Sequence, residues 1–220
     1  MGRPYVIKTT ENNMKKLQLM LMLLVILSAC SSVATPAPET KPEASPSIEV
    51  TAAPALKYHP LDTMTQIEEI DLVLYAIASG DVQELRNLFG FTTLACKTVN
   101  ALGGPPECRE GEAEGTLVEV LPSQSGEGSY LRKAEVGKFP GLDVIGVYAI
   151  YQVSETAYSE ENFPKGDYAI MLIAPENRPG VVLQIKNGQI VRIDYVFDPQ
   201  SFDMILQRDA STFVLSPISK

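Results

Sequence analysis

Tryptophan is absent from this sequence of 220 residues, and histidine and cysteine are scarce, with one and three copies. That gives too few ligands for most zinc sites, which use four Cys or His side chains. No Ser/His/Asp set, glycine-rich phosphate loop or other metal motif is present either. The one histidine, His59, stands beside Pro60, where we expect a surface position. We therefore predict no catalytic residue, no metal and no cofactor.

Positive charge is also in short supply, because 18 Lys and Arg residues stand against 27 Asp and Glu residues. Binding to nucleic acid is driven largely by Lys and Arg that neutralise phosphates. The formal net charge of −9 therefore argues against a nucleic-acid partner. It also argues against electrostatic docking onto anionic lipid.

A short apolar run near the N-terminus predicts export. Lys15 and Lys16 precede the run Leu17–Leu27, and the small residues Ser28 and Ala29 follow it. At 1.5 Å per residue, this run is too short to span a hydrocarbon core of about 30 Å. A basic segment, a short apolar segment and small residues are the three parts of a signal peptide. We assign the signal peptide to residues 1–29, with translation starting at Met1 or Met14.

The segment Leu27-Ser28-Ala29-Cys30 resembles the lipobox of bacterial lipoproteins. That resemblance implies that Cys30 is diacylated and becomes the new N-terminus. The lipid bilayer would then be a partner through Cys30, with the protein on the extracytoplasmic face of a cell membrane or an outer membrane. The alternative is plain secretion with an incidental cysteine.

Composition divides the rest of the chain into a linker and one domain. Residues 30–56 are rich in Pro, Ala, Ser, Thr and Glu and contain no aromatic residue, so we expect a disordered, semi-stiff linker. Residues 57–220 are long enough to bury roughly two-thirds of their surface as a single domain. The linker is expected to hold this domain away from the membrane.

Two cysteines remain for the domain, Cys96 and Cys108. Disulfides persist in exported proteins, and the spacing is not that of a Cys-x-x-Cys redox site. We predict a Cys96–Cys108 disulfide, which stabilises by about 3 kcal/mol in the chain-entropy model. The glutamates that follow, within residues 109–115, favour a solvated loop over a weak calcium site.

Hydrophobic periodicity predicts helices first and strands afterwards. Apolar residues at helical spacing precede Gly80, which is expected to end a helix, and Asp81 is expected to cap a second one. Strands are predicted at 91–96, 116–121, 142–153, 168–174, 181–186 and 189–197. Asn187-Gly188 predicts a tight hairpin, and Asp198-Pro199 the start of a last helix. This order predicts an α+β fold with N-terminal helices packed on an antiparallel sheet.

Two segments, 70–85 and 187–198, resemble the opening and the last hairpin of NTF2-like (cystatin-like) domains. The resemblance implies a curved, cone-shaped sheet around a pocket. Members bind small molecules, pair with other proteins, or act as isomerases or hydratases, and fold does not decide between these. We expect a non-enzymatic domain that binds a small ligand or an envelope protein. The alternative is a small-molecule isomerase or hydratase.

Arg192 and Asp194 are the candidate ligand-binding residues. They share one face of the last strand with Ile190 and Val196, and a two-residue turn places Arg192 opposite Leu183. If this face lines the cone, the pair orients a polar ligand in an apolar pocket. If it faces water, the pair is an ordinary surface ion pair, which we prefer because Asp and Arg are rarely buried.

Overall fold

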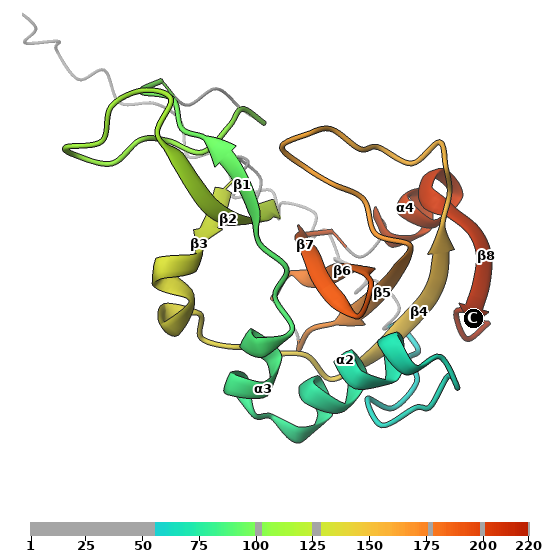
Figure 1. The fold of residues 1–220 in the computed structure, drawn as a ribbon. Helices are drawn as coiled ribbons and strands as arrows, with labels where there is room; N and C mark the ends of the chain where they lie inside the picture. Colours follow the sequence, from blue (N-terminus) through green and yellow to red (C-terminus); the bar gives the residue numbers. More distant parts are fainter. Residues whose placement is uncertain (1–55, 100–102, 125–128, 176–177, 199–200, 220) are drawn as a thin grey trace, which may run out of the picture. The chain divides into compact units, whose positions relative to one another are not determined.

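The computed structural model describes residues 56–99, 103–124, 129–175, 178–198 and 201–219 (Figure 1). The predicted signal peptide, Cys30 and nearly all of the predicted linker lie outside the described residues.

Eight strands form one mixed sheet in the order β1-β2-β7-β6-β5-β4-β8, and β3 pairs with β2 (Figure 1). The strands are β1 (Thr92–Ala95), β2 (Leu117–Gln124), β3 (Ser129–Arg132), β4 (Gly146–Val153), β5 (Tyr168–Ile173), β6 (Gly180–Lys186), β7 (Gln189–Val196) and β8 (Ala210–Leu215). The helices are α2 (Glu68–Ser79), α3 (Val82–Asn87), the 3-10 helix η1 (Lys133–Lys138) and α4 (Ser201–Asp209).

The expected α+β fold, with N-terminal helices packed on an antiparallel NTF2-like cone, is wrong. The sheet is mixed, because β2 runs parallel to β7, and the helices are few and short. The prediction assumed that every strand pairs with its sequence neighbour. The outer edge of β7 instead receives two segments from early in the chain. Phe89 bridges to Ile190, and the end of β2 pairs with Ile193 and Asp194.

Three local predictions are confirmed, each at a position where one or two residues dictate the backbone conformation. Gly80 ends α2 with a φ of 71°, the left-handed conformation that favours glycine. Asp81 caps α3 by accepting hydrogen bonds from the backbone N–H groups of Gln83 and Glu84. The turn at Asn187-Gly188 joins β6 to β7 as predicted.

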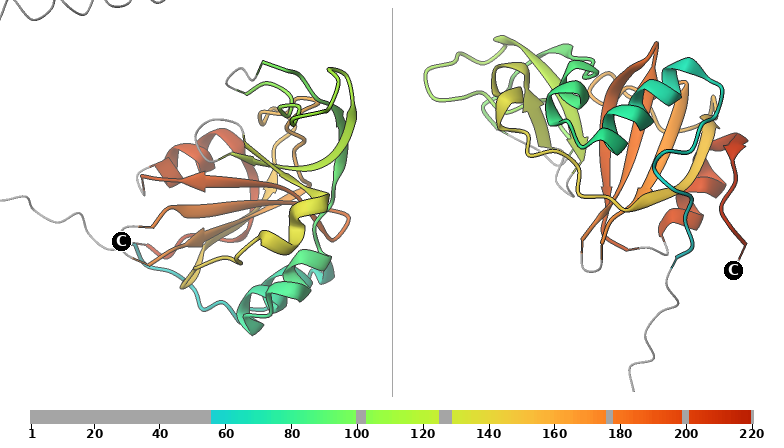
Figure 2. Two further views of the ribbon diagram at one scale, coloured as in Figure 1. Left: turned by 90° about the vertical axis from the view of Figure 1, so that its left-hand side faces the viewer. Right: turned by 90° about the horizontal axis from the view of Figure 1, so that it is seen from below.

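The two faces of the sheet carry separate hydrophobic cores. Figure 2 shows α2 and α4 on opposite sides of the sheet. Helix α2 covers one face, and its buried residues Ile70, Val73 and Leu74 pack with residues of β4 to β7. Helix α4 covers the other face through Phe202 and Leu206. We call these the α2 face and the α4 face.

The C-terminal region contains a strand that the sequence patterns did not predict. Helix α4 was expected from Asp198-Pro199 onwards, and it spans Ser201–Asp209, with residues 199–200 outside the described part. Strand β8 follows at once and pairs with β4 through an irregular register.

The two ends of the described domain meet beside β4. The backbone of His59 exchanges two hydrogen bonds with Val147, of 2.8 and 2.9 Å. The imidazole Nε2 of His59 lies 2.9 Å from the carbonyl oxygen of Ser216, and Lys57 Nζ donates to the carbonyl of Ser219. His59 is therefore half-buried in a ladder that joins both ends, and not the surface histidine that we expected.

Candidate functional site

A pocket of about 250 Å³ opens on the α2 face, where β3 and η1 meet β7. We call it the junction pocket. Its walls are mostly aromatic and aliphatic, and two serines and one charged pair complete the lining. The residues are Ser123, Ser129, Tyr130, Leu131, Glu135, Lys138, Phe139, Pro140, Ile193 and Tyr195. Such a combination of apolar walls and a few polar groups is typical of ligand pockets.

The junction pocket continues into a second depression of about 430 Å³. Tyr195 and Pro140 line both, and the second depression also contacts Asp143 and Arg178, which form an exposed ion pair. The two depressions are therefore neighbours along the segment 139–143.

Two tyrosines line the junction pocket, and both stay neutral well above pH 7. Burial, with smaller contributions from the nearby Tyr158 and Glu160, raises the pKa of Tyr130 to about 12. Burial also raises the pKa of Tyr195, although a hydrogen bond with Ser123 acts in the opposite direction. Tyr130 Oη donates to the carbonyl oxygen of Gly104 at 2.8 Å.

The rim of the pocket carries a small ion-pair network. Lys138 Nζ lies 2.8 Å from Glu135, and Arg109 contacts the other oxygen of the same carboxylate. The hydrogen bond from Lys138, together with Arg109, lowers the pKa of Glu135. Lys138 is largely exposed, so the network leaves a cation at the mouth of the pocket.

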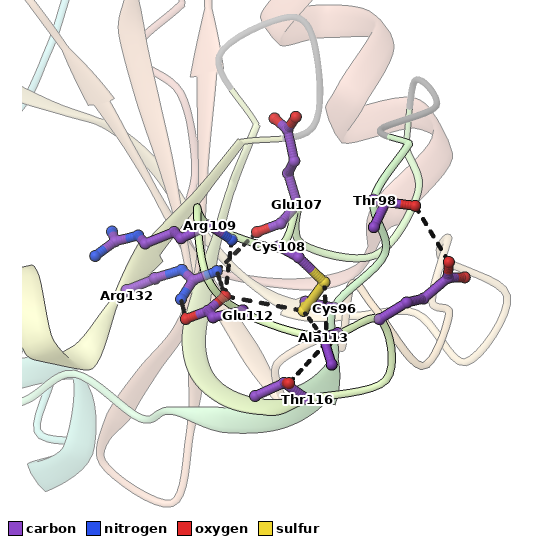
Figure 3. The surroundings of a disulfide bond; sticks show 10 residues. Cys96, Thr98, Glu107, Cys108, Arg109, Glu112, Ala113, Thr116 and Arg132 are labelled. Carbon is purple, nitrogen blue, oxygen red and sulfur yellow. Dashed lines mark hydrogen bonds and ion pairs between the residues drawn. A yellow bond between two sulfur atoms is a disulfide. The ribbon is translucent and has the colours of Figure 1, made fainter. Parts of the chain in front are cut away.

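A disulfide joins Cys96 and Cys108, the pair that the sequence predicts (Figure 3). Their Cα atoms are 4.9 Å apart. Cys96 is buried at the end of β1, while Cys108 is half-buried in the loop that follows. The bridge therefore closes the loop whose Gly104 binds Tyr130 of the pocket.

The glutamate loop beside the disulfide is not uniformly solvated. Glu112 accepts two hydrogen bonds from Arg132, of 2.6 and 2.9 Å, and one from the backbone N–H of Arg109 (Figure 3). Arg132 also donates to the carbonyl of Glu107 and is almost fully buried. The Arg132 hydrogen bond lowers the pKa of Glu112 from 4.5 to about 2. In the described residues, no group of three or more His, Cys, Asp or Glu side chains is arranged to hold a metal ion.

The candidate residues Arg192 and Asp194 form an ion pair with an Nε–Oδ2 distance of 2.9 Å. Our preferred expectation, a pair facing water, is wrong because the two side chains are only 5% and 18% exposed. Neither residue lines the junction pocket or the depression beside it. Arg192 Nη1 instead lies 3.4 Å from each of three backbone carbonyls, those of Tyr158, Phe163 and Pro164.

A β-bulge explains why the predicted face and register failed. Ile185 pairs with Ile190, but Gln184 pairs with Arg192, so one extra residue, Val191, interrupts β7. Ile190 therefore packs in the core of the α2 face, whereas Arg192 and Asp194 belong to the α4 face with Val196.

Sequence patterns did not predict the junction pocket. Tyr130 lies in a stretch whose pattern does not distinguish strand from helix, and it becomes β3 followed by η1. Ile193 and Tyr195 alternate along β7, which is the one available signal for a shared face. What stands opposite them depends on the parallel β2–β7 contact, which no local pattern encodes.

Comparison with known protein families, curated proteins and solved structures found no match for this chain. None of the helices in the described ranges is long and apolar enough to cross a membrane.

Proposed function

We propose that this chain is a membrane-anchored lipoprotein of the extracytoplasmic face, and that its domain binds a ligand or protein partner without catalysing a reaction. The sequence supports the anchor through Lys15, Lys16, the apolar run and Cys30. The observation that carries the binding role is the junction pocket, which has aromatic walls and an ion-pair network at its rim.

The chemistry of the pocket favours binding. Tyrosine phenols are protonated at neutral pH, and burial raises the pKa values of Tyr130 and Tyr195 further above it. They therefore offer aromatic faces, although the Tyr130 hydroxyl group already donates to Gly104, and they are poor general bases. An uncharged, largely apolar group with a hydrogen-bond acceptor fits this lining. The alternative of an isomerase or hydratase depended on the NTF2-like cone, which is not the fold observed.

The anchor is tested by replacing the acylated residue. Cells that express the chain are grown with labelled palmitate, and we expect label on the wild-type protein and none on Cys30→Ser. Ser31→Ala, next to it, serves as the control and is expected to keep the label. An unlabelled wild-type protein, or label on Cys30→Ser, would contradict lipid attachment at this residue.

The binding role is tested by native mass spectrometry of the full chain, released from its own membranes with mild detergent. We expect a reproducible adduct on the wild type and its loss in Tyr195→Ser, which removes one aromatic wall. Tyr75→Ser is the matched control, because Tyr75 is 66% exposed on α2 and does not line the pocket. Wild-type protein without an adduct, or an adduct that is retained in Tyr195→Ser, would contradict binding in the junction pocket.

A further inference from the structure

The loop between β4 and β5, residues 154–167, places one aromatic ring against the wall of the junction pocket. Phe163 is fully buried, and its ring stacks on Tyr130 with centroids 5.5 Å apart and planes inclined by 26°. Tyr130 in turn lines the pocket and is tied to Gly104 through its hydroxyl group. Phe163 therefore packs directly against that wall.

The buried guanidinium group of Arg192 lies against the backbone of this loop. Arg192 Nη1 lies 3.4 Å from each of three carbonyl oxygens, on Tyr158, Phe163 and Pro164. Its Nε donates to Asp194 Oδ2 at 2.9 Å. Because the guanidinium group is planar and rigid, holding Nε also holds Nη1. The carboxylate on β7 thus orients the donor that faces the loop.

In the described part of the chain, the surroundings of Asp194 give its carboxylate one polar contact, the hydrogen bond from Arg192. Tyr151 of β4 and the ion pair Arg208–Asp209 of α4 face it across the core of the α4 face. Within the described residues, Asp194 Oδ1 and Tyr151 Oη have no hydrogen-bond partner. The other carboxylate oxygen, Oδ2, accepts the hydrogen bond from Arg192. Burial raises the pKa of Asp194, as expected for a carboxyl group that is removed from water.

We propose that Arg192 and Asp194 are positioning residues of the junction pocket, which act from behind its wall by holding the Phe163 segment and, through it, Tyr130. The meaning of this arrangement rests on the proposed binding function, whereas the positioning itself is measurable without any ligand. Arg192 and Asp194 would then shape the site without touching what it binds.

The test is the reactivity of Tyr130 in the full chain in detergent micelles. Tetranitromethane nitrates phenolate groups, and peptide mass spectrometry reports the rate at each tyrosine. In Arg192→Met, we expect Phe163 to loosen and the pKa of Tyr130 to fall from about 12 towards the ordinary value of about 10. Each unit by which the pKa falls raises the phenolate fraction at pH 8 tenfold, so nitration of Tyr130 should accelerate about tenfold for each unit. Amide hydrogen exchange over residues 158–164 should accelerate as well.

The arginine of another ion pair on the α4 face, Arg208, provides the control. Arg208→Met breaks the Arg208–Asp209 pair on α4, and Tyr130 should react as in the wild type. Equal acceleration in both variants, or no acceleration in Arg192→Met, would overturn the proposal. If Arg192→Met fails to fold, Asp194→Asn replaces it, and an unchanged Tyr130 in that variant would also count against positioning.

The outcome is independent of the binding test. If the wild type carries no adduct but Tyr130 responds to Arg192→Met, the binding proposal fails and the positioning stands. If an adduct is lost in Tyr195→Ser but Tyr130 is unaffected in Arg192→Met, the pocket binds and the positioning role fails.

Discussion

At the scale of single residues, three arginine–carboxylate pairs each bury one of their partners. These are Arg132–Glu112, Arg192–Asp194 and Arg208–Asp209, in which the buried members are Arg132, Arg192 and Asp209. A buried pair adds little net stability over apolar residues, but removal of one partner leaves a buried charge that is expensive. Each pair therefore constrains its surroundings strongly while it contributes modestly to the free energy of unfolding.

In the Arg192–Asp194 pair, the cost of removing one partner can be compared with the cost of replacing both. We expect Asp194→Ala to lower the free energy of unfolding by about 3–5 kcal/mol, because Arg192 remains buried without its carboxylate. The double variant Arg192→Met/Asp194→Leu should recover most of that loss. Urea unfolding of the three proteins measures both values, and equal losses in the single and double variants would refute the argument.

The Glu112 carboxylate should control part of the acid sensitivity. Its pKa is lowered in the folded state to about 2, mainly by the hydrogen bond from Arg132. A lowered folded-state pKa contributes stability above the unfolded value of 4.5 that is lost as the pH falls towards 2. We expect Glu112→Gln to flatten the loss of stability between these pH values, as measured by urea unfolding from pH 2 to 7. Glu110→Gln, at an exposed neighbour, should retain the wild-type slope.

At the scale of elements, the loop 154–167 depends on a glycine at its end. A Cβ atom on Gly166 would lie 2.5 Å from both the backbone N and O of Ile185, and backbone cannot move aside easily. We expect Gly166→Ala to lower the free energy of unfolding by about 1–3 kcal/mol. Gly137→Ala is the matched control, because its Cβ would meet nothing within 4 Å, and it should be nearly neutral. Thermal unfolding compares the two, and similar losses would contradict the clash.

The disulfide should stabilise the β1–β2 region mainly through the unfolded state. We expect Cys96→Ala/Cys108→Ala to lower the free energy of unfolding by about 3 kcal/mol, the chain-entropy value for a loop of this length. Reduction of the wild type should have the same effect, and the double variant should not respond to reductant. A reductant effect of equal size in the variant would show that another group is responsible.

Sequence patterns predicted the elements whose geometry one or two residues impose. Gly80 and Asp81 set helix ends, and Asn187-Gly188 sets a hairpin, because few other backbones suit those residues. The bulge at Val191 was missed, since an extra residue leaves no mark in an alternating apolar strand. It moved Arg192 to the other face and changed the interpretation of the candidate site.

Pairing between strands that are far apart in the sequence was also not predicted. Strand β8 is short, pairs irregularly with β4 and follows α4 without a turn signal, so periodicity did not reveal it. The parallel contact between β2 and β7 joins residues about 70 positions apart, and local patterns carry no information at that distance. The junction pocket is built across this contact and was therefore unpredictable. The disulfide was predictable because the domain has one pair of cysteines.

At the scale of the whole molecule, the acidic balance means that the membrane attachment proposed above would depend on the lipid at Cys30. The chain has a formal net charge of −9, which gives no attraction for anionic lipid. We expect a chain that begins at Ser31 to remain in solution when mixed with anionic vesicles at low salt, as measured by co-sedimentation. Neutral vesicles serve as the comparison, and salt-sensitive binding to the anionic ones alone would contradict this view.

The meeting of the two domain ends beside β4 has a consequence for how the chain can be rearranged. Lys57 reaches the backbone of Ser219 with its own side chain, so the two ends stand within about one lysine length of each other. A few glycines would join them without disturbing the ladder between His59 and Val147. The order of the segments along the chain is thus separable from the fold, and a circular permutant opened at an exposed turn should adopt the same sheet.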